Sequence, residues 1–431
     1  MARLVDRLRS GSWLTRERMR LVALILLAAM LIGAGFLIGT SNGLNDRFGR
    51  PLGTDFSNVY AAGTYVLDGE PAAPFDPERQ FARERKIFGA DTQFYGWHYP
   101  PYFLGLAAAL ATMPYWLSLL VWQGVTLFLY LLAMRAVLIA PATAADGGER
   151  TSSDRGFPFE GGMSNDWLLL ALAFPAVFIN LGQAHNGFLT AALIGAALVQ
   201  LDRRPIFGGV LIGLLAYKPQ FGVLIPLVLA ASGRWRAFAA AAATVALMTL
   251  AVTAAFGSEV WSAFFAFTKF TRSVVLEQGG TGWYKIQSVF SWVRMWGGGI
   301  ELAYAAQIAL ALVVAAALIW LWCSRAAYPL KAAGLLIGSL LATPYSLDYD
   351  LMLLAPAIAF LAADGMRRGF GPYEKSMLAA LWVAPLIARS AAQTILLPLG
   401  VLAMLAAFAL LLRRAIAERA PRPHGILDSA A

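Results

Sequence analysis

The sequence predicts an all-α integral membrane protein that crosses the bilayer many times. Of its 431 residues, 59% are hydrophobic and only 14% are charged, whereas a soluble domain carries about a quarter charged residues. The apolar residues form long blocks, and a membrane-spanning helix needs about 20 of them. Four blocks approach that length without a charge: 21–39, 238–256, 302–323 and 395–412. These observations exclude a soluble globular protein.

The charge distribution at the N-terminus predicts the orientation of the first span. Residues 1–20 hold six arginines but only two acidic residues, Asp6 and Glu17. Cytoplasmic flanks of membrane spans are enriched in Lys and Arg, so we expect 1–20 to be a cytoplasmic stub before a retained span. The net charge of +9 comes from basic residues scattered at segment ends. It therefore indicates a membrane topology and no nucleic-acid partner.

Further basic clusters allow the remaining topology to be predicted. Alternating spans place all of these clusters on the cytoplasmic side: 203–204, 234–236, Arg325, 367–368 and 413–414. The result is one bundle over 21–413 with about 12 crossings. Its loops are a first outer loop at 40–101 with interfacial helices, a cytoplasmic loop at 141–166, an outer loop at 257–301 and a cytoplasmic tail at 414–431. The stretch 102–140 is too long for one span, so we expect a half-helix at 102–113, a break at Pro114 and then a span.

Four polar clusters interrupt the apolar pattern, and this topology puts all four on the outer side. They are 53–56, 180–186, 216–220 and 343–350. Ionisable groups at membrane depth are costly, and they are therefore candidates for function. The outer face of the bundle is thus the predicted location of the site.

Two charged residues stand out in these clusters. Asp55 precedes a stretch, 56–67, with apolar and aromatic residues at helical spacing, so it is either an N-cap or a catalytic base. Lys218 lies before Pro219 in a run otherwise free of charge from 207 to 232. It either extends its amine to the membrane interface or binds an anionic headgroup in a cavity.

The other candidate residues also have more than one interpretation. The double proline after Tyr99 predicts an interfacial anchor, with His98 as a further candidate contact. The polar groups of 183–186 either bind a sugar or satisfy helix ends, and Asp348 and Asp350 fit a structural role as well as a site role. Among 431 residues Cys323 is the only cysteine, and no metal-ligand spacing or nucleotide-binding motif is present. We therefore expect no cofactor, and a divalent metal stays open as an alternative for which the sequence has no motif.

Six motifs in this order resemble glycosyltransferase family 87. They are Gly-Thr-Asp-Phe at 53–56, Tyr-Ala-Ala-Gly at 60–63, Tyr-Pro-Pro at 99–101, Asn-Leu-Gly-Gln at 180–183, the run 209–219 that ends in Tyr-Lys-Pro, and Thr-Pro-Tyr at 343–345. The resemblance extends from about 21 to 361. It implies a GT-C-like bundle in a bacterial plasma membrane, with its active site facing the periplasm.

The resemblance also implies substrates and residue roles. It implies transfer of a hexose, with mannose favoured, from a polyprenyl-phosphate sugar to a glycolipid or glycan acceptor. Asp55 resembles the catalytic base and Lys218 the lysine that faces the donor phosphate. Apart from the resemblance, Arg272 or Lys285 could supply further positive charge for that phosphate. The expected substrate contacts are His98, Tyr99, Gln183, His185, Asn186, Gln220, Tyr345, Asp348 and Asp350. One departure bears on the sugar: mannosyl members often carry His in the late outer motif, where this chain has 347–350.

The chemistry agrees with one carboxylate and several cations. A polyprenyl phosphosugar carries its own leaving group, so the site needs a base for the acceptor hydroxyl and positive charge for the departing phosphate. Direct displacement with Asp55 as base inverts the anomeric centre, because retention needs a second, nucleophilic carboxylate. Two rivals remain: a lipid-linked glycan ligase or polymerase, and a lipid or sugar transporter or flippase.

Overall fold

The computed structural model describes residues 2–139 and 166–418, and this part of the chain is all-α, with no strand. Seven of its helices are long and apolar enough to cross a membrane, or eight if the bent pair α7 (Asp166–Leu172) and α8 (Pro175–Gln183) forms one span. Five shorter apolar helices accompany them. The all-α polytopic membrane fold predicted from the sequence is therefore confirmed. The predicted loop at 141–166 lies almost entirely outside the described residues.

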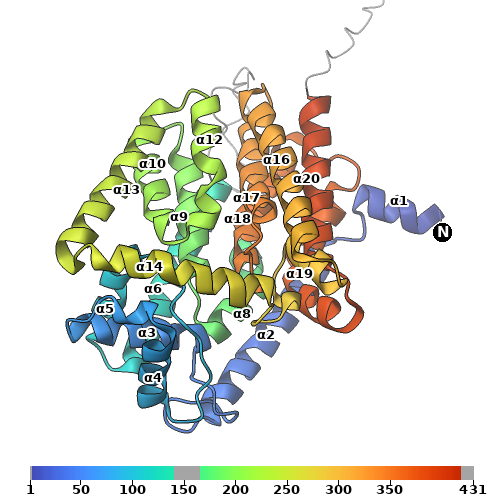
Figure 1. The fold of residues 1–431 in the computed structure, drawn as a ribbon. Helices are drawn as coiled ribbons and strands as arrows, with labels where there is room; N and C mark the ends of the chain where they lie inside the picture. The colour runs from blue at the N-terminus through green and yellow to red at the C-terminus, as the bar shows by residue number, and fades with distance from the viewer. Residues whose placement is uncertain (1, 140–165, 419–431) are drawn as a thin grey trace, which may run out of the picture.

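Long and short apolar helices together form one bundle (Figure 1). They are α2 (Arg16–Gly39), α6 (Tyr115–Ile139), α9 (Gly187–Gln200), α10 (Pro205–Gly213), α12 (Leu224–Ala231), α13 (Trp235–Phe256), α16 (Ile300–Cys323), α17 (Tyr328–Ala342), α18 (Leu354–Arg368), α19 (Glu374–Ile395) and α20 (Leu399–Ala417). α17 lies at the centre, since most of its side chains are buried. α2 and α13 lie at the periphery, with most of their surfaces exposed. Exposed apolar helix surface of this kind suits a lipid environment.

Prolines explain why the bundle contains several short helices. α8, α10, α11 (Pro219–Gly222) and α17 all have Pro in their first turn, where the missing N–H costs nothing because no partner is available there. A break also separates α5 (Leu104–Ala111) from α6, as the sequence predicts around Pro114. Helix breaks at membrane depth need polar surroundings, and the break before α11 lies within the polar cluster at 216–220.

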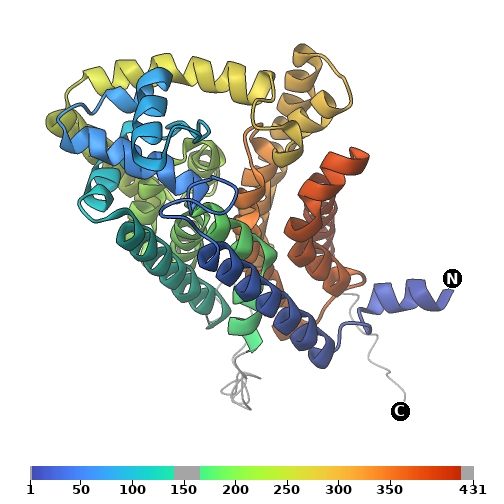
Figure 2. The ribbon, with the colours of Figure 1, turned by 90° about the horizontal axis from the view of Figure 1, so that it is seen from below.

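The segments 40–101 and 257–301, both predicted as outer loops, fold into helices at one end of the bundle. These helices are α3 (Thr54–Leu67), α4 (Pro77–Phe88), α14 (Glu259–Phe270) and α15 (Val289–Met295). Figures 1 and 2 show α3 and α4 beside α14, which runs across the ends of the bundle helices. We call this the polar end, because the polar clusters at 180–186, 216–220 and 343–350 lie here.

The opposite end, the basic end, is tied together by contacts of arginines and helix termini. Arg234 pairs with Asp202 at 3.0 Å and lies 4.9 Å over the ring of Trp322. Arg368 pairs with Glu418 at 2.7 Å, and the Ala327 N–H donates to the same carboxylate. All the predicted cytoplasmic basic clusters therefore belong to one end of the molecule. One boundary differs from the sequence prediction, because α20 continues to Ala417, beyond the predicted end at 413. The N-terminal stub also contains a helix, α1 (Ala2–Ser10), which the sequence did not predict.

Candidate functional site

The segment that follows α17 supplies two buried carboxylates. It enters the 3-10 helix η7 (Asp348–Leu353), where the Asp350 carboxylate accepts the Leu347 N–H at 3.0 Å. Asp348 likewise accepts the N–H of Tyr349 at 3.0 Å. Both side chains are at most 2% exposed. Local N–H donors at a helix start thus fix two carboxylates at the polar end.

Lys218 reaches the second of these carboxylates. It occupies the break between the 3-10 helix η4 (Leu214–Tyr217) and α11, and its ammonium forms an ion pair with Asp350. Its side chain is 5% exposed, and its Nζ lies 5.1 Å from the ring centroid of Tyr349. The alternative in which Lys218 extends to the membrane interface is therefore wrong, because its charge is satisfied inside the protein.

Aromatic and amide groups cover the same ion pair. The His185 ring stacks on Tyr349 with centroids 3.5 Å apart, and its Nε2 is 3.1 Å from the hydroxyl of Tyr99. Asn180 satisfies a helix start, because its Oδ1 accepts the Gly187 N–H at 3.0 Å. In this polar cluster Asn180 therefore satisfies a helix end, while His185 faces the site.

The backbone before α3 places Asp55 near these groups. Gly53 has a φ of +71°, which favours glycine, and a Cβ there would come within 2.8 Å of both Ala184 and Leu119. The Tyr115 hydroxyl donates to the carbonyl of Leu52 at 2.5 Å and fixes the same turn. α3 therefore begins against the end of α8, next to His185.

Asp55 does not cap α3. Gly53 is the N-cap and no side chain caps the helix, while Asp55 lies in the first turn. The N-cap alternative is therefore wrong. Among the described residues, Asp55 makes no hydrogen bond or ion pair, so its carboxylate is committed to no structural contact.

The electrostatic surroundings of Asp55 raise its pKa to about 7. The main cause is burial, which disfavours the charged form, and the nearby Asp348 adds to it. Lys285 and Lys218 act in the opposite direction. Burial raises the pKa values of the Tyr99 and Tyr345 phenols, and the nearby charges of Asp55 and Asp350 add to this effect. The structure thus gathers seven of the predicted residues into one cluster, which we call the carboxylate cluster: Asp55, Tyr99, Lys218, Lys285, Tyr345, Asp348 and Asp350.

A second chain segment brings positive charge to this cluster. Lys285 ends the 3-10 helix η6 (Trp283–Lys285), and the Gln287 N–H donates to the Ser346 carbonyl at 2.6 Å. That backbone contact holds Lys285 beside the Asp348 turn. Within the described ranges, Lys285 has no hydrogen-bond or ion-pair partner, so its ammonium is available to an anion.

Arg389 is a cation that the sequence prediction missed. It lies on α19 and approaches Asp348 at 3.3 Å, with its side chain 40% exposed. Its guanidinium also lies 5.7 Å from the ring of Tyr284. An arginine inside the apolar segment 374–395 was the available signal, because charge within a span marks functional candidates.

Several buried polar atoms beside the cluster have no hydrogen-bond partner within the described part of the chain. They are His185 Nδ1, both side-chain polar atoms of Asn186 and Ser346 Oγ. Buried polar groups are nearly always paired in native proteins. Their presence in one neighbourhood indicates a surface adapted to a polar ligand, and it agrees with the predicted substrate contacts at His185 and Asn186.

Four predicted residues lie apart from the carboxylate cluster. Arg272 is 67% exposed and pairs with Glu277 at 3.3 Å. His98 bonds through Nδ1 to the Thr271 hydroxyl at 2.9 Å, and burial lowers its pKa to about 4. No side-chain hydrogen bond joins Gln183 or Gln220 to the cluster in the described ranges. These four residues therefore frame the polar end without joining the charged cluster.

Glu84 is a second carboxylate with a raised pKa, and it supports the site from α4. Its carboxylate accepts the N–H groups of Tyr95 at 3.0 Å and Gly96 at 3.2 Å. Burial raises its pKa to about 7. Glu84 thereby fixes the loop that leads to Tyr99. No group of three His, Cys, Asp or Glu side chains is arranged to hold a metal ion in 2–139 or 166–418.

The fold and the cluster define a polytopic membrane protein with a charged, partly unpaired site at one end of its bundle. The family model of glycosyltransferase family 87 matches residues 97–344, more than half of the chain. The chain therefore belongs to glycosyltransferase family 87 and is a membrane glycosyltransferase. No curated protein and no solved structure matches it. The matched range includes Lys218 and Lys285, whereas Asp55, Asp348 and Asp350 lie outside it.

Proposed function

We propose that this glycosyltransferase moves a hexose, with mannose favoured, from a polyprenyl-phosphate donor to a glycolipid or glycan acceptor on the outer face of a bacterial plasma membrane. The observation that carries the proposal is Asp55, an unpaired carboxylate with a pKa near 7 that faces Lys285 and Lys218. A general base works best when its pKa lies near the working pH. Cations beside it match the need of a departing phosphate.

The proposed reaction is a single displacement. The acceptor oxygen attacks the anomeric carbon while the bond from that carbon to the phosphate oxygen breaks. The hydroxyl proton passes to the Asp55 carboxylate, and the electron pair of the broken bond leaves with the polyprenyl phosphate. The configuration at the anomeric carbon inverts, because no second carboxylate forms a covalent intermediate.

The structure suggests how the cations divide their roles. Lys218 is already paired with Asp350, so in the proposal it holds that carboxylate in place and supplies a positive field. Lys285, which is unpaired among the described residues, and the partly exposed Arg389 are the proposed phosphate ligands. Arginine and lysine both bind phosphate through charge-assisted hydrogen bonds. If the Arg389 side chain moved from Asp348 to the donor phosphate, Asp348 would lose its partner, and donor binding would change the charge balance of the carboxylate cluster.

The proposed activity can be tested with the purified full chain in lipid nanodiscs. Radiolabelled polyprenyl-phosphate mannose, polyprenyl-phosphate glucose and the matching sugar nucleotides are offered with a glycolipid acceptor extract. We expect label transfer from one polyprenyl-phosphate sugar and release of polyprenyl phosphate, with no transfer from sugar nucleotides. Transfer from the nucleotides alone would overturn the donor assignment.

The proposed orientation rests on the location of the basic clusters at one end of the bundle. In a Cys323→Ser background, single cysteines replace Asp68 on α3 and Arg203 at the opposite end. Both are exposed. On intact spheroplasts an impermeant thiol reagent should label the cysteine at 68 and should reach the one at 203 only after lysis. The reverse pattern would overturn the orientation.

A further inference from the structure

The N-terminal helix α1 has two distinct faces. Leu4, Val5 and Leu8 are 62%, 47% and 39% exposed, and no residue of α1 is buried. At about 100° per residue these three side chains share one side of the helix. Arg7 and Arg9 then flank this apolar stripe, and Arg3 lies on the opposite side. Within the described residues the three arginines form no ion pair.

Specific contacts fix this helix at the basic end. The Arg9 carbonyl accepts the Tyr373 N–H at 2.8 Å, and the Leu8 carbonyl accepts the Ser376 hydroxyl at 2.7 Å. The Trp13 indole donates to the same hydroxyl at 2.9 Å. α1 is therefore held at the start of α19. These hydrogen bonds use backbone carbonyls in the last turn of α1, so the apolar stripe of α1 stays free.

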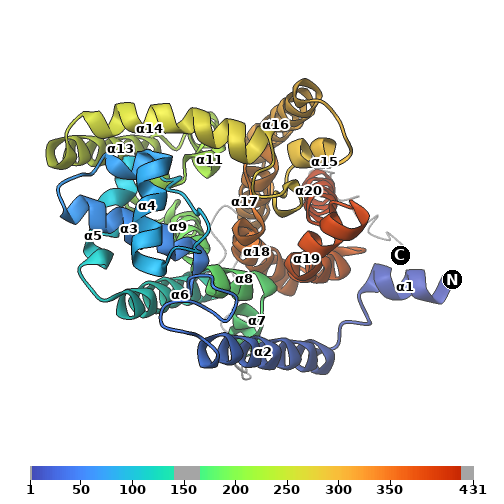
Figure 3. The same ribbon diagram turned by 60° about the horizontal axis from the view of Figure 1, so that its bottom comes forward.

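A neighbouring contact places that attachment beside the basic cluster at 413–414. Arg413 on α20 donates to the Pro372 carbonyl at 2.9 Å, directly before α19. Figures 2 and 3 show α1 projecting sideways from the bundle beyond α20. A short helix that leaves a membrane bundle sideways, at the level of the positively charged helix ends, meets the lipid surface.

We propose that α1 is an interfacial helix that binds anionic phospholipid headgroups. Leu4, Val5 and Leu8 enter the boundary between headgroups and acyl chains, as the apolar face of an interfacial helix does. The arginines meet the lipid phosphates, because clustered basic residues beside a span are attracted to anionic leaflets. The proposal concerns the membrane surface alone and stands independently of the donor, the acceptor and the role of Asp55.

The test uses the full chain in vesicles of phosphatidylcholine or of phosphatidylcholine with a quarter phosphatidylglycerol. In a Cys323→Ser background an environment-sensitive fluorophore is attached through Leu4→Cys, and Asp6→Cys on the polar face is the matched position. We expect the label at 4 to shift to shorter wavelength and to be quenched by acyl-chain quenchers, more strongly in anionic vesicles. The label at 6 should remain in a water-like environment.

A charge variant tests the headgroup contribution. Replacing Arg3, Arg7 and Arg9 with Gln should remove the difference between the two vesicle types, since each basic residue near an anionic surface favours binding by several-fold. The matched control replaces three exposed arginines away from α1, Arg203, Arg204 and Arg325, with the same change of net charge, and should keep the difference. The proposal is overturned if both label positions behave alike, or if the control removes the anionic response as completely as the α1 variant.

Discussion

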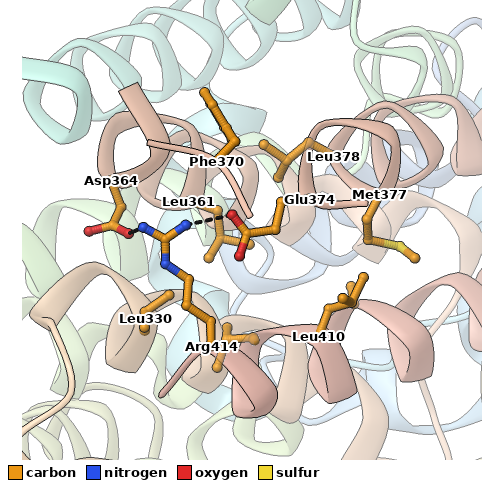
Figure 4. A pocket seen from close by; sticks show the side chains of 11 residues that line it. Leu330, Leu361, Asp364, Phe370, Glu374, Met377, Leu378, Leu410 and Arg414 are labelled. Atoms are coloured by element: carbon orange, nitrogen blue, oxygen red, sulfur yellow. Dashed lines mark hydrogen bonds and ion pairs between the residues drawn. The ribbon is translucent and has the colours of Figure 1, made fainter. Parts of the chain in front are cut away.

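Both ends of the bundle bury carboxylates together with basic side chains, but the pairing differs. At the basic end, Arg414 binds Asp364 at 2.7 Å and Glu374 at 2.5 Å, and Arg368 binds Asp364 as well. Figure 4 shows Arg414 between the two carboxylates beside a small pocket. The rest of the pocket lining is mostly apolar and includes Leu330, Leu361, Phe370 and Met377. Every carboxylate in this group has a guanidinium partner.

At the polar end, the charges are matched only in part. Asp350 has Lys218 and Asp348 has Arg389, while Asp55 and Lys285 remain without an ion-pair partner among the described residues. A fully paired network stabilises one arrangement, whereas unpaired groups keep their interactions for a ligand. Pairing, more than burial or charge, therefore separates a structural cluster from a candidate site in this protein.

The largest expected effect is at Asp55. Asp55→Asn keeps the shape of the side chain but cannot accept a proton, so transfer should fall roughly 10²–10⁴-fold. Folding and donor binding should persist, because the side chain makes no structural contact. Transfer assays with size-exclusion profiles and donor-binding measurements check this. Asp68→Asn, at the exposed end of the same helix, should transfer normally; near-normal transfer by Asp55→Asn would move the base to Asp348 or Asp350.

The unpaired cations come next. Lys285→Met combined with Arg389→Met should lower kcat/KM by roughly 10²- to 10⁴-fold, because hydrogen bonds to charged groups contribute about 1.5–3 kcal/mol each. Arg272→Met removes a charge from the same end but from a residue paired with Glu277, and it should change kcat/KM little. Steady-state kinetics at varied donor concentration measure both. A larger loss in Arg272→Met than in the double variant would contradict the assignment.

The pH dependence should follow Asp55. Since a base acts in its ionised form and its pKa is about 7, kcat/KM should fall about tenfold per unit below pH 7 and level off above it. Glu84 has a similar pKa, so Glu84→Gln is the control. Transfer rates from pH 5 to 9 should show the same acidic limb in this variant. If the decrease of kcat/KM below pH 7 disappears in Glu84→Gln, that decrease belongs to Glu84 and its assignment to Asp55 is wrong.

Glu84 also predicts a pH effect on stability. Its folded pKa is raised above the ordinary value of 4.5, so the folded state binds the proton more tightly than the unfolded state does. The stability from that protonation is fully present below about pH 4.5 and is lost as pH rises towards 7. Thermal unfolding of Glu84→Gln should therefore show a smaller decrease over this range than the parent protein.

The smallest effect on transfer is expected at the basic end. Arg414→Gln leaves Asp364 and Glu374 short of a partner, and breaking a buried pair costs about 3–5 kcal/mol. The thermal midpoint in detergent should drop clearly, while transfer per folded molecule stays within about twofold. Thermal unfolding with activity normalised to folded protein separates the two. A loss of transfer without a loss of stability would make this cluster functional.

The fold class could be predicted from the sequence pattern, because the length of the apolar blocks, the prolines and the basic clusters are local signals. The pattern also found most of the carboxylate cluster, since charges inside apolar runs are conspicuous. The sequence pattern could not predict the ion pairs. Lys218 and Asp350 are 132 positions apart, and no periodicity shows that one neutralises the other. The hypothesis that Asp55 is the N-cap was wrong because of the local backbone. Gly53 adopts a positive φ and is the N-cap, two residues earlier.

The packing of α3 against α5 has an evolutionary consequence. A Cβ at Gly63 would come within 2.1 Å of the Ala107 carbonyl oxygen and within 2.7 Å of the Ala111 Cβ. The two backbones therefore touch, and α3 carries Asp55 two turns away. A larger residue at 63 would push the carboxylate out of position unless α5 moved too. Among related chains, glycine should consequently be retained at position 63, because its nearest neighbour is the backbone carbonyl of Ala107, which no side-chain substitution removes.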